Sequence, residues 1–330
     1  MKLRPVGLIV VFALLGAPPV AYAQQAGKVY RIGVLDSGRP PSPGNWRLLL
    51  FVKLKELGWV EGQNVEYVGR FTEGNLQRLP AAAAELVSLG VDVIVTFGGT
   101  PPTLAAKQAT QTIPIVFTSA GDPVERGLVA SLARRGGNVT GIANFVTYGK
   151  LLELLKEAVP KISRVAFLHS PAVFASPENV KTYLATVEAE ARTLNLKVQP
   201  VPLQTPEEIE RVFQDFGRNS PEGLLVDDVQ ATVLAREQLC RRAIQEKLPA
   251  IGQSRVFPEA GCLLSYGEPP AERFRQVAVL VDKVLRGAKP ADLPVERMTT
   301  LEMVINLKTA KALGLKIPQS VLVRADEVIQ

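Results

Sequence analysis

The stretch DVIVTFGGTPPTLAAKQATQTIPIVFTSAGDP, Asp92 to Pro123, decides the fold of this chain, because it predicts a strand, a helix and a second strand in direct succession. Asp92–Phe97 is a short β-branched run, typical of a strand buried on both faces of a parallel sheet. Two glycines end it, and Thr100 is placed to cap a helix that begins at the following proline pair. Ile113–Thr118 predicts the next strand, which leads into a polar loop.

Small polar groups and a helix N-terminus therefore gather at one edge of the predicted sheet. In open α/β sheets, ligands bind at the carboxyl ends of the strands. Thr100 and the nearby N–H groups could hold an anionic group such as a carboxylate, or the segment could be a plain tight turn. Asp122 stands before Pro123 and could hold a ligand amine or hydroxyl, or cap the helix that follows; both interpretations stay open.

The same alternation of strands and helices extends over the rest of the chain and predicts two doubly wound, parallel α/β sheets joined by a hinge. Residues 28–146 form the expected lobe I and residues 147–267 the expected lobe II. Residues 268–295, a helix and a linker, are expected to return to lobe I. Residues 296–330 are expected to form a third hinge segment and a C-terminal tail, whose lobe the sequence leaves open.

Local sequence signals predict several individual helices. Thr205-Pro206-Glu207-Glu208 is a capping box with proline in the first turn. Val124–Leu132 predicts a short helix, and a single helix is expected from about Thr232 to Lys247.

The N-terminus has the pattern of a secretory signal peptide. Lys2 and Arg4 precede the apolar run Val6–Val20, and an A-x-A site ends at Ala23. Glycine and proline within the run argue against a membrane anchor, and no cysteine follows the site to carry a lipid. Cleavage after Ala23 would place the mature chain in the periplasm, and no other stretch is apolar enough to span a membrane.

Composition argues against nucleic-acid binding. The formal charge of +6 falls to +4 once residues 1–23 are removed, and the basic residues are spread along the chain.

Cys240 and Cys262 are the only cysteines. An oxidising compartment would allow them to pair, yet two buried thiols are the simpler expectation. Together with the single histidine they do not supply a metal site.

The sequence contains no recognisable catalytic constellation. His169 is the only histidine and no G-x-S-x-G motif accompanies it, so a cleft-lining or packing role is expected. The Asp227-Asp228 pair has no further ligands at metal-binding spacing and is expected in a solvated loop, with one member lining the cleft. Dinucleotide and phosphate-loop motifs are absent, so no cofactor and no enzymatic activity are expected.

Several segments together resemble one protein family over essentially the whole mature chain. The resemblance is to bacterial ABC-transporter substrate-binding proteins related to the tryptophan-binding TrpX type. It implies a type I periplasmic-binding fold that traps a small ligand between two lobes and delivers it to a membrane permease. The segments are VYRIGVL, LKELGWVEGQNV, RLPAAAAELVSLGVDVIVTFGGTPPTLAAKQAT, TIPIVFTSAGDPV, GLVASLARRGGNVTGIAN, KLLELLKEAVPKISRVAFL, LPAIGQSRVFPEAGCLLSYG and INLKTAKALGLKIPQSVLVRADEVI.

The resemblance also indicates where the ligand would lie. Thr100, Asp122 and Asn144 match cleft positions of lobe I, and fold analogy adds strand-end residues of lobe II. His169-Ser170-Pro171 departs from the Trp-Asn-Pro-like turn of many relatives, so an aromatic amino acid is not assumed as ligand. The full expected ligand-binding set is Asp36, Ser37, Gly99, Thr100, Ser119, Asp122, Asn144, His169, Asp227, Gln253 and Tyr266.

The expected function is that of a monomeric, non-enzymatic receptor for a small polar solute, such as an amino acid or related compound, that works with ABC permease subunits. Ligand contacts made to both lobes at once would favour the closed state. Two alternatives remain: a periplasmic ligand sensor for a signalling partner, and a secreted α/β enzyme that uses the same cleft.

Overall fold

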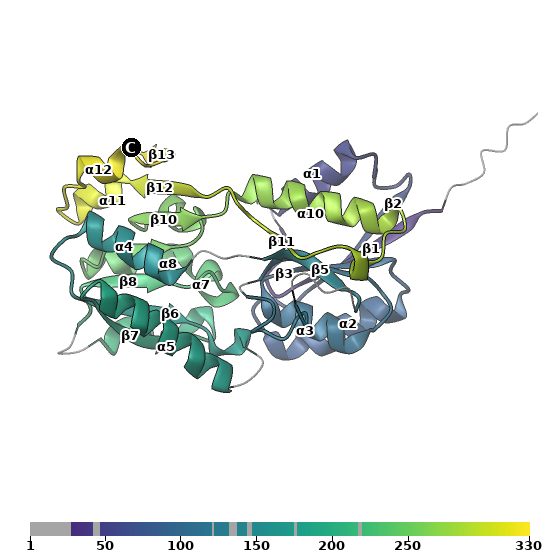
Figure 1. Ribbon diagram of the computed structural model, residues 1–330, viewed down its shortest axis with the longest axis horizontal. Coiled ribbons are helices and arrows are strands. Elements are labelled where there is room, and N and C mark those ends of the chain that lie inside the picture. The colour runs from purple at the N-terminus through teal and green to yellow at the C-terminus, as the bar shows by residue number, and fades with distance from the viewer. Residues whose placement is uncertain are drawn as a thin grey trace, which may run out of the picture.

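The computed structural model describes residues 28–41, 47–120, 122–131, 137–143, 147–174, 177–216 and 220–330. The expected signal peptide and Asn144 lie outside these residues. Two α/β units, called here the first and the second lobe after their order in the chain, lie side by side along the longest axis (Figure 1).

The first lobe contains a six-stranded, fully parallel sheet of order β11-β5-β4-β3-β1-β2. Its elements are β1 (Tyr30–Asp36), α1 (Leu48–Glu56), β2 (Val65–Phe71), η1 (Leu76–Arg78), α2 (Leu79–Ser88), β3 (Val93–Phe97), α3 (Thr100–Ala109), β4 (Ile115–Ala120), β5 (Val139–Ala143), α10 (Pro270–Leu285), η4 (Pro290–Asp292) and β11 (Glu296–Arg297).

The second lobe contains a seven-stranded sheet of order β13-β12-β10-β9-β8-β6-β7. Its elements are α4 (Tyr148–Ala158), β6 (Arg164–His169), η2 (Pro171–Val173), α5 (Pro177–Thr193), β7 (Lys197–Pro202), η3 (Pro206–Glu208), α6 (Ile209–Gln214), β8 (Gly223–Val226), α7 (Gln230–Leu234), α8 (Arg236–Gln245), β9 (Ala250–Gly252), α9 (Val256–Glu259), β10 (Leu264–Gly267), β12 (Glu302–Asn306), α11 (Leu307–Ala312), α12 (Gln319–Leu322) and β13 (Glu327–Ile329).

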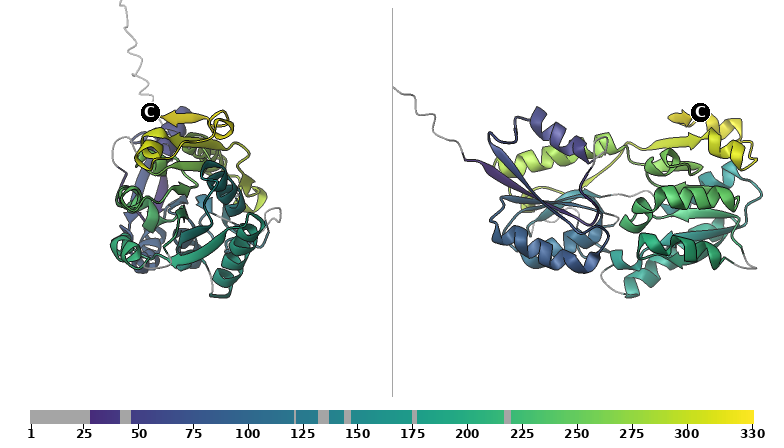
Figure 2. Two further views of the ribbon diagram at one scale, coloured as in Figure 1. Left: turned by 90° about the vertical axis from the view of Figure 1, so that its left-hand side faces the viewer. Right: turned by 180° about the vertical axis from the view of Figure 1, so that it is seen from behind.

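The central strand β3 explains why the first sheet is covered on both faces. Every residue of β3 is buried. Val93 and Val95 belong to a core shared with α1 and α10, whereas Ile94 belongs to a second core shared with α2 and α3. Figure 2 shows these two helix pairs on opposite sides of the sheet. Side chains of a strand alternate between the faces, so a continuous apolar run is needed to fill both cores.

The chain passes between the two sheets three times: between β5 and α4, between β10 and α10, and between β11 and β12 (Figure 1). Residues 296–330 are divided by the last crossing, since β11 pairs with β5 while β12 and β13 pair within the second sheet. Three connections therefore join the two sheets.

The second sheet is not fully parallel, which corrects the sequence-based expectation. Strand β12 runs antiparallel to β10. It enters the second lobe from the crossing, at the edge where β6, β8, β9 and β10 end, and must therefore run the opposite way.

Two predicted helices differ from the structure. The described part of Val124–Leu132 forms turns instead of a helix, and Gly127 there adopts a φ of 73°, which interrupts helical geometry. The helix expected from Thr232 to Lys247 is divided at Ala235 into α7 and α8.

Cys240 and Cys262 form a disulfide, which corrects the expectation of two buried thiols. Cys240 lies on α8 and Cys262 follows α9, and their Cα atoms are 4.7 Å apart, a distance that a disulfide spans. The bond ties α8 to the approach of β10 inside the second lobe.

None of the helices in the described ranges combines the length and the apolar character needed to cross a bilayer. Within the same ranges, no group of His, Cys, Asp and Glu side chains is arranged to hold a metal ion.

Candidate functional site

The carboxyl ends of strands from both sheets approach each other between the lobes. Ser37, directly after β1, is fully buried and donates its hydroxyl to Gln230 Oε1 on α7, 3.3 Å away. Gly98 follows β3, and a Cβ there would lie 2.0 Å from Ser37 Oγ. Its φ of 88° also favours glycine. Gly98 is therefore needed for this close approach.

The start of α3 forms the first-lobe side of the site. Gly99 is the N-cap residue and Thr100 is already helical, so Thr100 does not cap the helix as predicted. Its fully buried hydroxyl instead accepts a hydrogen bond from Arg126 Nη1 at 3.3 Å. Three groups thus meet at one point: a helix N-terminus, a hydroxyl and a guanidinium. Each of them can stabilise a bound anion.

Arg126 reaches across to the second lobe. It lies in the turns after β4, and its guanidinium carbon is 4.8 Å from the centre of the Phe174 ring. Arg126 is not among the residues predicted from the sequence, because it does not lie directly at a strand end. The sequence feature that could have indicated Arg126 is a basic residue in the loop that follows a strand ending at the cleft.

Asp227 forms the second-lobe side of the site. It follows β8, is buried, and accepts hydrogen bonds from the hydroxyls of Tyr148 and Tyr183, the latter at 3.5 Å. Burial raises the pKa of the Asp227 carboxyl, and the positive charge of Arg126 opposes that rise. Burial, followed by the charge of Asp227, raises the pKa of both tyrosines well above the ordinary value, so both stay protonated and can donate.

Tyr148 and Tyr183 connect Asp227 to a cluster of aromatic rings. The ring of Tyr183 lies 4.7 Å from that of Phe174 and 5.5 Å from that of Tyr148, and Tyr148 lies 5.0 Å from Phe167. His169, at the end of β6, stacks against Phe167 and is buried. Burial lowers the pKa of His169 to about 4, so its ring is neutral at neutral pH. The sequence-based expectation of a cleft-lining or packing residue describes this position.

Asp122 is placed at the same edge but is engaged locally. Its Oδ1 accepts hydrogen bonds from the backbone N–H groups of Val124 and Glu125, so it caps the turn. The carbonyl of Glu125 accepts a hydrogen bond from Asn179 Nδ2 of α5, which joins the lobes. For Ser119, the structure describes only its place in β4.

The other predicted residues lie in three different surroundings. Asp36 accepts a hydrogen bond from the N–H of Gly38 and pairs with Arg47 at 2.9 Å, within the first lobe. Gln253 is buried at the end of β9. Tyr266 is half-buried and packs against the core of the second lobe.

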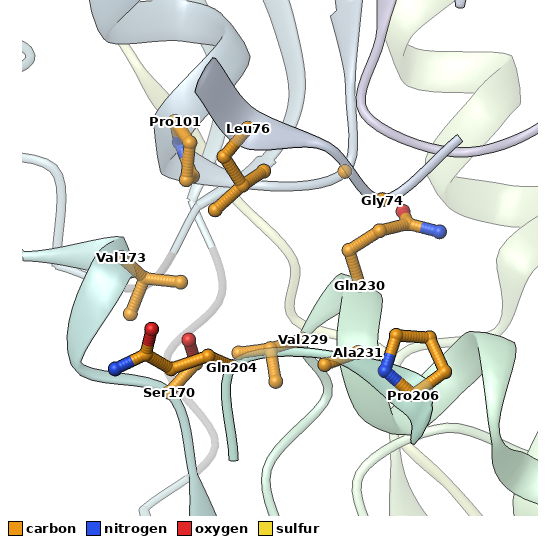
Figure 3. A pocket seen from close by; sticks show the side chains of 11 residues that line it. Gly74, Leu76, Pro101, Ser170, Val173, Gln204, Pro206, Val229, Gln230 and Ala231 are labelled. Atoms are coloured by element: carbon orange, nitrogen blue, oxygen red, sulfur yellow. The ribbon is translucent and has the colours of Figure 1, made fainter. Parts of the chain in front are cut away.

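A small pocket lies beside the site, between the lobes (Figure 3). Pro101 and Leu76 line it from the first lobe, and Val173 and Val229 from the second. Its volume of about 20 Å³ leaves room for roughly one water molecule. The lobes are therefore in close contact here.

Comparison with known proteins gives one family over most of the chain. The sequence profile described as ABC transporter substrate binding protein matches residues 50–329. The tyrosine-binding protein of Clostridioides difficile (strain R20291) is 28% identical over 289 residues, which cover 88% of this chain and 82% of that protein.

Solved structures extend this similarity to three dimensions. A conserved domain protein from Vibrio cholerae has a TM-score of 0.83, with 28% identity over 91% of this chain and all of that one. An ABC domain from Streptococcus pneumonia in complex with L-Trp has a TM-score of 0.82, with 28% identity over 92% of this chain and all of that one. The ligand-free, open structure of an adhesive substrate-binding protein from Clostridium difficile has a TM-score of 0.64, with 25% identity and the same coverage.

Proposed function

The chain belongs to the ABC transporter substrate-binding proteins, and we propose that it captures a free amino acid between its two lobes for import. The bound, closed form would then be recognised by the membrane permease. The expected signal peptide, with cleavage after Ala23, would deliver the chain to the periplasm as a monomer. Its role would be to bind and release the solute without chemical change.

The opposition of Arg126 and Asp227 across the cleft carries this proposal. A free amino acid has a carboxylate and an ammonium group on one carbon, and the site offers one partner for each. The carboxylate would bind Arg126, the Thr100 hydroxyl and the start of α3. The ammonium group would bind Asp227, which Tyr148 and Tyr183 hold in place.

The rings around Asp227 favour a flat apolar side chain on the ligand. Phe174 and Tyr183 offer ring faces and edges of the kind that stack on aromatic groups. The named relatives, a tyrosine-binding protein and a complex with L-Trp, point to the same chemistry. L-Tyrosine and L-tryptophan are therefore the first candidates, despite the His169-Ser170-Pro171 turn.

Closure of the lobes is the proposed mechanism of capture. The chain overlaps better with the L-Trp complex than with the open, ligand-free relative, although identity and coverage are similar. The contacts from Ser37 to Gln230 and from Glu125 to Asn179 join the lobes on either side of the site. A ligand that touches both lobes stabilises this arrangement over the open one.

The test is a thermal-shift screen of the twenty L-amino acids against the purified mature chain, followed by calorimetric titration of every hit. A ligand that binds only the folded state raises the melting temperature. We expect the largest shifts from L-tyrosine or L-tryptophan. The absence of a shift with all twenty amino acids would refute the proposal.

A further inference from the structure

A second group of charged side chains joins the lobes on the hinge side of the ligand site. Arg47, just before α1, pairs with Asp36 at 2.9 Å and donates a hydrogen bond from Nη2 to Gln230 Oε1 at 3.4 Å. Arg47 therefore links the end of β1 in the first lobe to α7 in the second.

Glu268 lies in the crossing between β10 and α10, next to this link. It is buried, and its Oε2 has no hydrogen-bond partner in the part of the chain that the structure describes. The nearest cation is Arg273 of α10, whose Nη1 is 3.8 Å away, too far for a hydrogen bond. Asp228, from the loop after β8, faces Glu268 with a like charge. Asp228 in turn faces the guanidinium groups of Arg273 and Arg47 and the like charge of Asp227.

The charges of this hinge cluster, defined as Asp36, Arg47, Asp228, Glu268 and Arg273, do not balance. Among these described residues, three carboxylates face two guanidinium groups. Arg47 is engaged by Asp36, and Arg273 is shared between Asp228 and Glu268. One carboxylate is therefore in excess when all are ionised, and a buried excess charge is costly.

We propose that Glu268 takes up a proton when the lobes close, so that the closed, ligand-holding state becomes more favourable as the pH falls. This inference rests on the proposed closure and goes beyond it, because it makes the hinge sensitive to the acidity of the compartment.

The direction of the pKa shift supports the proposal. Burial raises the pKa of Glu268 from 4.5 to about 7; Arg273 opposes the rise and Asp228 adds to it. Arg273 belongs to α10 of the first lobe and Asp228 to the second lobe, so we infer that opening separates the groups around Glu268, admits water and returns its pKa toward 4.5. The closed state then binds more protons than the open one between these two values. Protonation of Glu268 therefore stabilises the closed state over the open one below about pH 7. This stabilisation is lost as the pH rises through the pKa that Glu268 has in the closed state.

The first experiment needs no ligand. Small-angle X-ray scattering of the ligand-free mature chain at pH 5.5 and pH 8.5 measures its radius of gyration. We expect a smaller radius at pH 5.5, and for Glu268→Gln the same small radius at both values. An equal radius for the wild-type chain at the two pH values would overturn the proposal, whether or not an amino acid has been found to bind.

The second experiment uses L-tyrosine as the probe. Calorimetric titration in buffers of different ionisation enthalpy counts the protons taken up on binding. For the wild-type chain we expect uptake near pH 7 and an affinity about tenfold higher at pH 6 than at pH 8. Glu268→Gln should abolish both effects. If Glu268→Gln keeps the wild-type pH dependence, the proton is bound elsewhere and the proposal is wrong.

Two further variants keep the test specific. Glu272→Gln alters a carboxyl in the first turn of α10 that pairs with Arg275 at 2.6 Å, outside the cluster. This variant should leave the pH dependence unchanged. Asp228→Asn removes the like charge that faces Glu268 and should move the midpoint of the pH response to lower pH. A midpoint that stays in place or rises in Asp228→Asn would contradict the proposed arrangement.

Discussion

The guanidinium of Arg126, carried by the first lobe, lies over the ring of Phe174, carried by the second, with 4.8 Å between its carbon and the ring centre. The same guanidinium donates a hydrogen bond to Thr100 at the start of α3. One side chain therefore touches both walls of the proposed ligand site. Its position makes the account testable residue by residue.

Replacing Arg126 by Gln removes the positive charge proposed to bind the ligand carboxylate. Hydrogen bonds to charged groups contribute about 1.5–3 kcal/mol, so the affinity for a verified amino acid should fall by about 10- to 100-fold. Calorimetric titration measures this change. The matched control is Arg211→Gln, an exposed arginine on α6, which should bind like the wild-type chain. Equal affinity of both variants would remove Arg126 from the site.

Asp227→Asn tests the partner of the ammonium group. The amide oxygen can still accept the hydrogen bond from Tyr148. Only the longer bond from Tyr183, at 3.5 Å, loses its acceptor, so the second lobe should stay folded. The lost charge should weaken amino-acid binding by about tenfold or more. Titration gives the affinity, and circular dichroism checks the fold. A well-folded variant with unchanged affinity would show that Asp227 is only structural.

Gly98→Ala should weaken the lobe contact and the fold around it. The new Cβ would lie 2.0 Å from Ser37 Oγ, and the φ of 88° is unfavourable for alanine. Residues forced into such conformations cost about 1–3 kcal/mol each. Urea denaturation should show a loss of this size. Gly90→Ala is the control, since it has a φ of 65° but no atom near its Cβ position, and should cost less. The reverse order would refute the proposed steric role.

The disulfide should stabilise the second lobe without contributing to ligand binding. It closes a loop with a sequence separation of 22, for which the chain-entropy relation gives about 3 kcal/mol. Chemical denaturation of the Cys240→Ser, Cys262→Ser double variant should show a loss of this order, with ligand affinity at 25 °C unchanged. A strong loss of affinity in the folded double variant would contradict this separation of roles.

The sequence predicted those elements that local chemistry determines. The capping box at Thr205 and Glu208 forms as expected. The two-lobed α/β class follows from the same alternation of apolar strands and one-sided helices, and the structural relatives confirm it. Short strands such as β11 were missed, because two residues carry no periodic pattern and depend on pairing with a distant strand.

The ligand site was predicted less completely, because side chains from distant elements meet there. Tyr183 lies within α5, and helical periodicity does not indicate that its hydroxyl contacts Asp227. Arg126 lies in turns that were expected to be helical, so its direction could not be inferred. The pairing of Cys240 with Cys262 likewise depends on how α8 meets the approach to β10.

The most direct test of the central claim compares three ligands of one ring structure by calorimetric titration: L-tyrosine, tyramine, which lacks the carboxylate, and 3-(4-hydroxyphenyl)propionate, which lacks the amine. If Arg126 and Asp227 grip the two charged groups of an amino acid, L-tyrosine should bind and each analogue should bind at least about tenfold more weakly. Equal affinity of all three, or binding of an analogue without binding of L-tyrosine, would contradict the account.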